Sequence, residues 1–232
     1  MEWILFDKDG TLIEFDKSWE KIGIRLVDKL LDTFPVHDKE VAHRQLGIMD
    51  DKIVPDSVMG SGSLGEMIKS FDNITGQDTS EWARNTSQEL VDSREPENNW
   101  IEGVYDTIVE LRKKGYKIGI VTSDTNKGAT QFLEATQSTS LFDLVISTET
   151  HAEEKPNPKV LDPLFAAYNV KPEQVAIVGD TANDMKTAIN AHLGLSIGVL
   201  TGIAKEEELH EADVIVESAK EVKNVIDQFS QK

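Results

Sequence analysis

The stretch Trp3-Ile4-Leu5-Phe6-Asp7-Lys8-Asp9-Gly10-Thr11-Leu12 contains an apolar run of strand length that ends in two aspartates one residue apart. A glycine follows at once, which allows the chain to turn sharply there. Two carboxylates at a strand end are costly to bury unless a cation or a proton shares the site. The simpler interpretation of Asp7 and Asp9 is a solvated acidic turn, and three later segments of the chain weigh against it.

The composition excludes several classes of protein. The chain has 232 residues, of which 39% are hydrophobic, enough for one large domain or for a core with a smaller inserted domain. Its 24 basic and 42 acidic residues give a net charge of −18, so we expect neither nucleic acid nor a membrane surface as a partner. The absence of cysteine excludes disulfides, thiolate catalysis and zinc–sulfur sites. With no signal peptide or membrane span in the sequence, we expect a cytoplasmic protein.

The first part of the chain is predicted to be mostly helical. After a strand at about residues 2–7, residues 14–97 carry helical patterns and no convincing strand. We expect helices at 18–31, 38–46, 63–71 and from 80 to about 94, separated by turn residues. Four helices of this size can bury one small core. We therefore predict an inserted helical cap domain over residues 14–97, and a core domain formed by residues 1–13 and 98–232.

From residue 100 onwards, strands and helices alternate. The patterns predict strands at 116–121, 143–147, 174–178, 196–200 and 213–216, and helices at 104–114, 127–135, 158–168, 182–193, 205–210 and 219–229. The strands are apolar without alternation, which indicates a parallel, doubly wound sheet of the α/β class. In such sheets the functional site lies beyond the carboxyl ends of the strands.

Polar side chains follow four of the predicted strands. They are Asp7 and Asp9 after the first strand, Thr122, Ser123 and Asp124 after the second, Lys155 after the third, and Asp180 and Asp184 after the fourth. Aspartates without nearby histidine or cysteine form a hard oxygen site that suits Mg²⁺. A carboxylate can attack phosphorus, and a second can protonate the leaving oxygen and then activate water. Lys155 and Mg²⁺ can offset the repulsion between an anionic nucleophile and an anionic substrate.

Together the four segments resemble the motifs of the haloacid dehalogenase superfamily of phosphohydrolases. Residues 7–12 match its DxDGT-L motif, 120–123 its strand-plus-Thr/Ser motif, 155–158 its lysine motif in the KPxP form, and 179–184 its GDxxxD motif. The helical insertion and the tail at 197–202 look like the phosphoglycolate phosphatase-like branch, which has an alpha-helical cap. The resemblance implies a Rossmann-like core and a Mg²⁺-dependent phosphatase that acts on a small phosphorylated metabolite.

The resemblance also implies roles for individual residues. Asp7 would be the nucleophile and Asp9 the acid/base, while Thr122 would bind phosphate and Lys155 would be a charge clamp. We count Ser123, the next hydroxyl along, among the substrate-binding candidates.

The Mg²⁺ ion would be held, on the same resemblance, by Asp7, by the backbone carbonyl of Asp9 and by Asp180. Asp184 would lie in or next to the metal shell.

Some features depart from the family pattern or match another one. Lys8 replaces an apolar residue, and we expect it to point to solvent rather than to the mouth of the site. Ser123-Asp124 replaces a common Asn, and His192 replaces a small residue. Residues Gly60–Gly65 fit GxGxxG, but a dinucleotide site needs a preceding strand. We interpret them as a loop that opens a cap helix.

Other functions remain open on the sequence alone. The same framework can serve a phosphosugar mutase of the beta-phosphoglucomutase type or, less well, a carbon–halogen hydrolase, for which Asp9 and the metal aspartates would be unnecessary. A non-catalytic module that binds a phosphorylated ligand is the alternative outside enzymes. Phosphoglycolate is the leading substrate, and the protein is expected to be a monomer or a homodimer.

Overall fold

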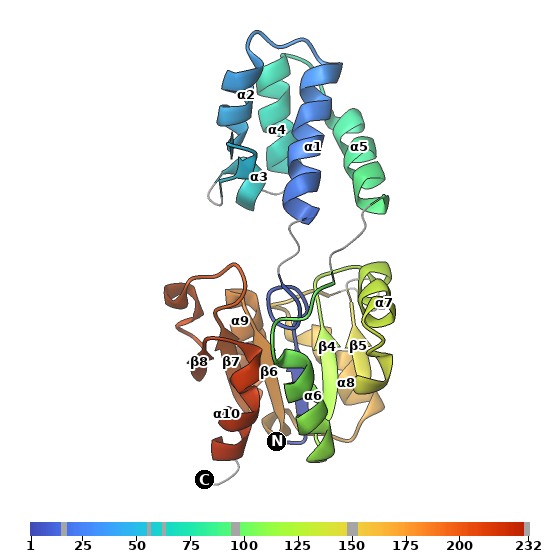
Figure 1. Cartoon of the computed structure of the whole chain (residues 1–232), viewed down its shortest axis with the longest axis vertical. Helices are drawn as coiled ribbons and strands as arrows, with labels where there is room; N and C mark the ends of the chain where they lie inside the picture. Colours follow the sequence, from blue (N-terminus) through green and yellow to red (C-terminus); the bar gives the residue numbers. More distant parts are fainter. Residues whose placement is uncertain (15–17, 55–56, 62–63, 94–97, 148–152, 230–232) are drawn as a thin grey trace. The chain divides into compact units, whose positions relative to one another are not determined.

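A computed structural model describes residues 1–14, 18–54, 57–61, 64–93, 98–147 and 153–229. The chain divides into two compact units, shown in Figure 1. Met1–Asp16 and Asn98–Lys232 form the first, which we call the core unit, and Lys17–Glu97 form the second, which we call the helical unit. Among the described residues, no helix combines the length and the apolar character needed to cross a membrane.

A six-stranded sheet forms the centre of the core unit. Its strands are β1 (Trp3–Phe6), β4 (Lys117–Val121), β5 (Leu144–Ile146), β6 (Val175–Gly179), β7 (Leu195–Val199) and β8 (Val214–Val216). They are all parallel and lie in the order β5-β4-β1-β6-β7-β8. The chain proceeds outward from β1 to β5 and then returns to β6 on the other side of β1, so the strand order reverses between β1 and β6. The predicted doubly wound α/β fold is confirmed, and its switch point lies at the end of β1.

Helices cover both faces of this sheet (Figure 1). On one face lie α6 (Val104–Lys113), α7 (Asn126–Ala135) and α10 (Val222–Phe229), and on the other lie α8 (Asp162–Ala167) and α9 (Ala182–Asn190). Ile4 and Phe6 pack into the first layer, whereas Trp3 and Leu5 pack into the second. Because successive side chains of a strand point to opposite faces, a strand covered on both faces is apolar at every position.

Several helices of the core unit are shorter than predicted. The predicted helix at 182–193 ends at Asn190, and His192 then adopts a left-handed conformation with φ of 54°, in which a helix cannot continue. The predicted helix at 158–168 divides into a 3₁₀ turn and α8. The 3₁₀ segments are η1 (Thr139–Leu141), η2 (Pro158–Leu161), η3 (Pro172–Gln174), η4 (Glu206–Leu209) and η5 (Ala219–Glu221).

The helical unit is built from α1 (Ser18–Thr33), α2 (Lys39–Leu46), α3 (Val58–Ser61), α4 (Leu64–Thr75) and α5 (Ser80–Asp92). Its own apolar core includes Val27, Leu30 and Phe71, all fully buried. The predicted ends of α2 are confirmed. Asp38 accepts a hydrogen bond from the backbone N–H of Val41 at 3.1 Å, and Gly47 closes the helix with φ of 89°.

Two details of the helical unit contradict the sequence prediction. A short antiparallel hairpin joins β2 (Ile48–Met49) and β3 (Lys52–Ile53) where no strand was expected. Its turn residues, Asp50 and Asp51, both have positive φ, as a tight two-residue hairpin requires, and two-residue strands are too short to leave a pattern. Helix α4 also runs four residues past its predicted end at residue 71, to Thr75.

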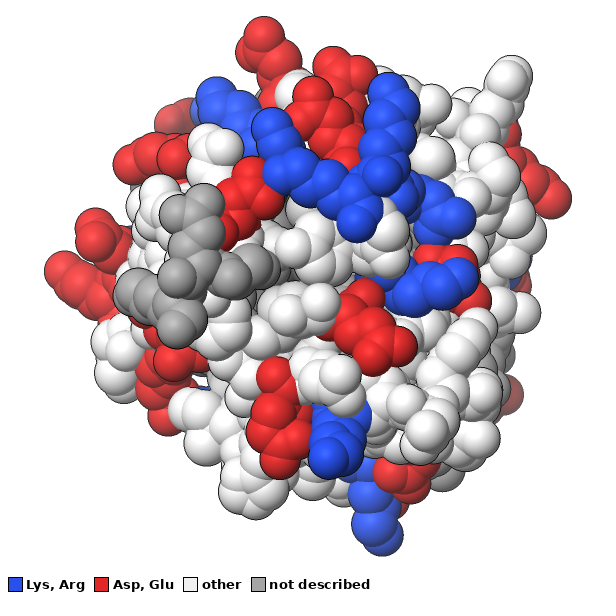
Figure 2. Space-filling model, turned by 90° about the horizontal axis from the view of Figure 1, so that it is seen from below, with Lys and Arg blue, Asp and Glu red and all other residues white. Residues whose placement is uncertain are grey.

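Basic residues cluster where α6 ends and β4 begins, at the lower end of the core unit in Figure 1. Figure 2 shows the face seen from below, where Lys and Arg side chains lie beside Asp and Glu side chains. Arg112 and Lys117 contact Asp143 at 2.6 and 3.0 Å, and the backbone N–H of Ile118 donates to it at 3.0 Å. Burial raises the pKa of Asp143, but these hydrogen bonds outweigh it and hold that pKa below its usual range. The cations therefore stabilise an ionised carboxylate within the unit.

Candidate active site

The end of β1 places Asp7 at the switch point of the sheet. Phe6 pairs with Ile120 of β4 on one side and with Val178 of β6 on the other, so the ends of the three strands are level. The backbone N–H of Asp7 continues the ladder by donating to the carbonyl oxygen of Val178 at 2.8 Å. The chain then turns, with Gly10 in a left-handed conformation at φ of 78°. The residues that follow these three strands are consequently brought together.

Lys155 joins two of the predicted aspartates. Its Nζ donates to Oδ1 of Asp7 at 2.8 Å and to Oδ1 of Asp184 at 2.6 Å. The lysine side chain is 4% exposed, and both carboxylates are buried. Ion pairs removed from water in this way interact strongly, so the three side chains are held in a fixed arrangement.

Backbone and hydroxyl groups hold the two aspartates that follow β6. The backbone N–H and Oγ1 of Thr181 donate to Oδ2 of Asp184 at 3.1 and 2.7 Å. The backbone N–H of Ile203 donates to Oδ2 of Asp180 at 3.0 Å, and Oγ1 of Thr11 donates to Oδ1 at 3.4 Å. These supporting groups were not predicted, because almost every residue has a backbone N–H and a threonine hydroxyl does not by itself indicate which carboxylate it will contact.

Three glycines provide the space that the carboxylates fill. A Cβ at Gly179 would overlap the carboxylate of Asp184, and a Cβ at Gly202 would overlap that of Asp180. A Cβ at Gly10 would lie 2.6 Å from Oδ2 of Asp180. Distances this short do not occur for real Cβ atoms, so each glycine is needed where it stands.

The site carries more negative than positive charge. Burial raises the pKa of Asp7 to about 8, and the carboxylates of Asp184 and Asp180 act in the same direction, while Lys155 lowers it. Burial and the charge of Asp184 also raise the pKa of Asp180, to about 6. Burial lowers the pKa of Lys155, but Asp184 and Asp7 more than compensate and raise it above its usual range. Three carboxylates thus lie beside one ammonium group, so a further positive charge would be needed to balance the negative charge of the cluster.

The donor set fits a divalent metal ion. Asp7, Asp180 and Asp184 each offer an oxygen, and these oxygens lie within 4.8 Å of one another. Hard carboxylate oxygens are the ligands that Mg²⁺ prefers, and the deficit of positive charge favours a cation. The residues present therefore fit the metal that the sequence predicts.

The side chain of Asp9 lies against Lys8. Nζ of Lys8 is 2.8 Å from Oδ1 of Asp9 and 2.7 Å from Oδ2, and it is 3.1 Å from Oδ2 of Asp124. The expectation that Lys8 points to solvent is wrong, because its side chain is 0% exposed. The two carboxylates, one from each strand-end loop, compensate its burial.

The loop after β4 carries the two predicted hydroxyl groups. Oγ1 of Thr122 accepts a hydrogen bond from the backbone N–H of Asp124 at 3.0 Å, and its own N–H donates to the carbonyl of Ile146 at 2.9 Å. Thr122 is buried, whereas Ser123 is exposed. Since Oγ1 is already an acceptor, its O–H remains able to donate to another oxygen.

The glycine-rich match in the helical unit begins within a helix, and the strand before it, β3, belongs to an antiparallel hairpin and not to a βαβ unit. Gly60 lies in α3, α4 begins at Leu64, and residues 62–63 lie outside the described part of the chain. In the same unit, His43 contacts Asp28 at 2.9 Å.

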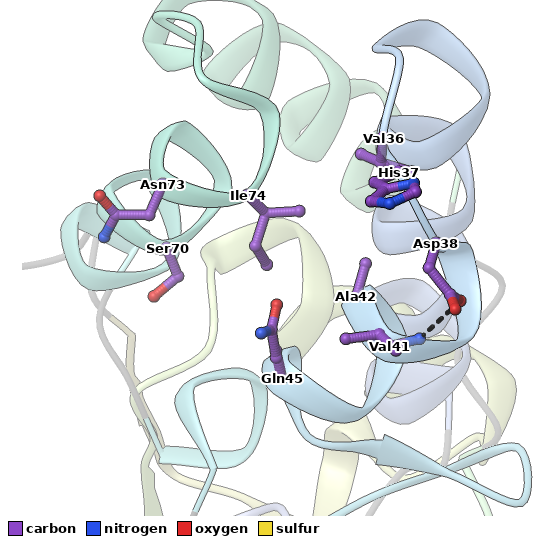
Figure 3. A pocket seen from close by; sticks show the side chains of 9 residues that line it. All are labelled: Val36, His37, Asp38, Val41, Ala42, Gln45, Ser70, Asn73 and Ile74. Atoms are coloured by element: carbon purple, nitrogen blue, oxygen red, sulfur yellow. Dashed lines mark hydrogen bonds between the residues drawn. The ribbon is translucent and has the colours of Figure 1, made fainter.

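A pocket of about 690 Å³ lies between α2 and α4 of the helical unit (Figure 3). Its polar side chains are those of His37, Asp38, Gln45, Ser70 and Asn73. No Lys or Arg is present among the residues that line it, and Oδ1 of its one carboxylate, Asp38, accepts the hydrogen bond that caps α2. It therefore offers a phosphorylated ligand no charge-assisted hydrogen bond from Lys or Arg.

Comparison with known proteins agrees with this chemistry. A family model described as haloacid dehalogenase-like hydrolase matches residues 4–195. The chain is 27% identical over 191 residues to pyrophosphatase PpaX of Bacillus cereus, which covers 81% of this chain and 78% of that protein.

Solved structures share the fold. A predicted phosphoglycolate phosphatase from Haemophilus somnus matches with a TM-score of 0.71 at 18% identity, over 97% of this chain and 98% of the other. A beta-phosphoglucomutase from Clostridium difficile matches with a TM-score of 0.61 at 19% identity, over 100% of this chain and 98% of the other.

Proposed function

The chain belongs to the haloacid dehalogenase-like hydrolase family, and from that premise we propose that it is a Mg²⁺-dependent phosphatase of a small phosphorylated metabolite. The observation that carries the proposal is Lys155, which bridges Asp7 and Asp184 within a buried cluster of three aspartates. This cluster combines a nucleophile, a cationic side chain and a set of metal ligands at one edge of the sheet.

In the proposed reaction Asp7 attacks the phosphorus atom. A bond forms between a carboxylate oxygen of Asp7 and phosphorus, the bond from phosphorus to the leaving oxygen breaks, and protonated Asp9 gives its proton to that oxygen. Asp9 then accepts a proton from water, whose oxygen attacks phosphorus, and inorganic phosphate leaves while Asp7 is regenerated. The aspartyl-phosphate on Asp7 thus divides one difficult hydrolysis into two steps.

The surrounding residues hold the phosphoryl group and offset its charge. Thr122 donates its hydroxyl hydrogen to a phosphoryl oxygen, and Lys155 keeps Asp7 in place while its positive charge faces the anionic substrate. Mg²⁺ bound to Asp7, Asp180, Asp184 and the carbonyl of Asp9 would supply the positive charge that lowers the repulsion between the nucleophile and the phosphate.

The helical unit is proposed to be the cap that selects the leaving group. A cap that closes over a phosphoryl site excludes bulk water and contacts the part of the substrate that differs between metabolites. Phosphoglycolate is our first candidate substrate. Inorganic pyrophosphate is the second, because the relative that covers 81% of the chain is named a pyrophosphatase.

The test is phosphate release from a panel that contains phosphoglycolate, pyrophosphate and several sugar phosphates. It uses the wild type and Asp7→Asn, each with Mg²⁺ and with a chelator. We expect release that needs Mg²⁺ and is lost in the variant, and the best substrate then identifies the leaving group. A turnover of sugar monophosphate that requires the bisphosphate would instead indicate a mutase. Binding without release from any compound would refute the proposal in favour of a phospho-ligand binding module.

A further inference from the structure

We infer that Lys8 is a positioning residue for Asp9 and that Asp124 is its counter-ion, an inference that rests on the proposed acid/base role of Asp9. In the sequence, Lys8 and Asp124 belong to two separate departures from the family motifs. In the structure they contact each other, at 3.1 Å between Nζ and Oδ2. The two departures therefore form one interaction.

Lys8 engages both oxygens of Asp9. Nζ lies 2.8 Å from Oδ1 and 2.7 Å from Oδ2, so a rotation of the carboxylate weakens at least one of the two contacts. The lysine side chain is fully buried, and Asp9 is 20% exposed. Hydrogen bonds from a buried ammonium group are stronger than those in water, so this arrangement restricts the orientation of the Asp9 carboxyl group.

Asp124 is itself fixed by the loop that carries it. The backbone N–H of Thr125 donates to its Oδ1 at 2.7 Å, and its own N–H donates to Oγ1 of Thr122 at 3.0 Å. Gly128 of α7 faces the carboxylate, and a Cβ there would overlap it. The carboxylate of Asp124 thus occupies a space that any residue other than glycine at position 128 would fill. It lies in the same loop as Thr122, whose hydroxyl is proposed to hold the phosphate.

The burial of these charges explains why the two residues occur together. An unpaired buried ammonium group is strongly disfavoured, and so is an unpaired buried carboxylate. An apolar residue in place of Lys8 would leave Asp124, whose side chain is 7% exposed, without this cation. A salt bridge that served stability alone would give the same contacts, so the test must measure a property that depends on the orientation of Asp9.

The leaving group of the substrate provides that property. An alkyl phosphate releases a basic alkoxide oxygen, which needs the proton of Asp9, whereas p-nitrophenyl phosphate releases a nitrophenolate that needs little help. The ratio kcat/KM covers substrate binding and the first chemical step, in which this proton is transferred. A misplaced Asp9 should therefore affect the alkyl substrate much more than the aryl one.

The experiment measures kcat/KM of Lys8→Met and of Lys8→Met/Asp124→Asn with phosphoglycolate, or the best alkyl phosphate of the panel, and with p-nitrophenyl phosphate. We expect kcat/KM to fall about 10- to 100-fold for the alkyl substrate and about threefold or less for the aryl substrate, since a misplaced Asp9 should lose part of the roughly 100- to 10,000-fold that general acid catalysis contributes. The double variant removes both charges, so it should recover thermal stability without recovering activity on the alkyl substrate. Lys114→Met, which breaks the pair with Asp227 elsewhere in the core unit, is the control. It should leave kcat/KM unchanged for both the alkyl and the aryl substrate.

Equal losses on both substrates, or no loss on either, would overturn the inference and leave a purely structural ion pair. If Lys8→Met does not fold, the double variant and Asp124→Asn still test the inference. The double variant removes the charges of both Lys8 and Asp124, and Asp124→Asn leaves Lys8 paired with Asp9. Asp124→Asn retains the contact between Lys8 and Asp9 and should show the same selectivity for leaving group at a smaller magnitude. Wild type that releases no phosphate from either substrate would refute the proposed function instead, so the two failures are distinguishable.

Discussion

Replacing Lys155 by Met should destabilise the core unit strongly, because it leaves three buried carboxylates without their shared ammonium group. The lysine makes two charge-assisted hydrogen bonds, at 2.8 and 2.6 Å, and is 4% exposed. Removing one partner of a buried ion pair costs about 3–5 kcal/mol. Met has a similar length and fills the space, so the loss of stability comes from removing the charge and not from creating a cavity.

The matched control is Lys114→Met. Lys114 contacts Asp227 at 2.5 Å, but the two side chains are 38% and 35% exposed, and an exposed pair contributes at most about 1 kcal/mol. The two substitutions make the same chemical change in different surroundings. The difference between them therefore isolates the effect of burial.

Amide hydrogen exchange of β1 and β6, measured at neutral pH with a chelator present, is the suitable assay. It reports the opening free energy of the core unit alone, whereas a single unfolding curve of a chain with two units mixes both. We expect the opening free energy to fall by about 3–5 kcal/mol in Lys155→Met and by about 1 kcal/mol or less in Lys114→Met. Equal, small losses in the two variants would refute the claim that the cluster is desolvated.

Three other substitutions test separate parts of the structure. Gly202→Ala should raise the Mg²⁺ concentration for half-maximal activity about 10-fold or more, because its Cβ overlaps the carboxylate of Asp180; an unchanged metal titration contradicts the proposed ligand role. Asp143→Asn should lower the free energy of unfolding by about 1–3 kcal/mol at pH 7, since its carboxylate accepts hydrogen bonds from charged groups. The pKa of Asp143 is lowered in the fold, so this stabilisation is present above the unfolded pKa and is lost as the pH falls through the folded pKa; hydrogen exchange of β4 at pH 7 and pH 3 measures that loss in the core unit alone. Phe71→Ala should cost about 3–5 kcal/mol in hydrogen exchange of α1 and α4 while β1 stays protected, and equal losses in both units would show that they unfold together.

The grouping of Asp7, Lys155, Asp180 and Asp184 was predictable from the sequence because all four residues follow strands of a parallel sheet. Apolar runs without alternation predicted the buried strands, and the residues that follow them had to gather at one edge of a parallel sheet. The contacts of Lys155 with Asp7 and Asp184 agree with that expectation. The helices of the helical unit were also predictable where caps marked them, as at Asp38 and Gly47.

Short or long-range features were not predictable in this way. The hairpin of Ile48–Met49 and Lys52–Ile53 is too short to produce a periodic signal. The backbone N–H of Ile203, which donates to Asp180, carries no signal at all, because every residue except proline has such a group.

By itself the sequence determined the class of fold and the carboxylates at the strand ends, because periodicity and residue type are local properties of the chain. Only the tertiary structure decided where the side chain of Lys8 lies. A lysine between two aspartates has no side-chain direction that its neighbours impose, and an exposed position is its ordinary one. The sheet order places β4 beside β1, so that Asp124 and Gly128 approach Lys8 and make its burial possible. Contacts between residues so far apart in the chain follow from the packing of the sheet, and local sequence carries no record of them.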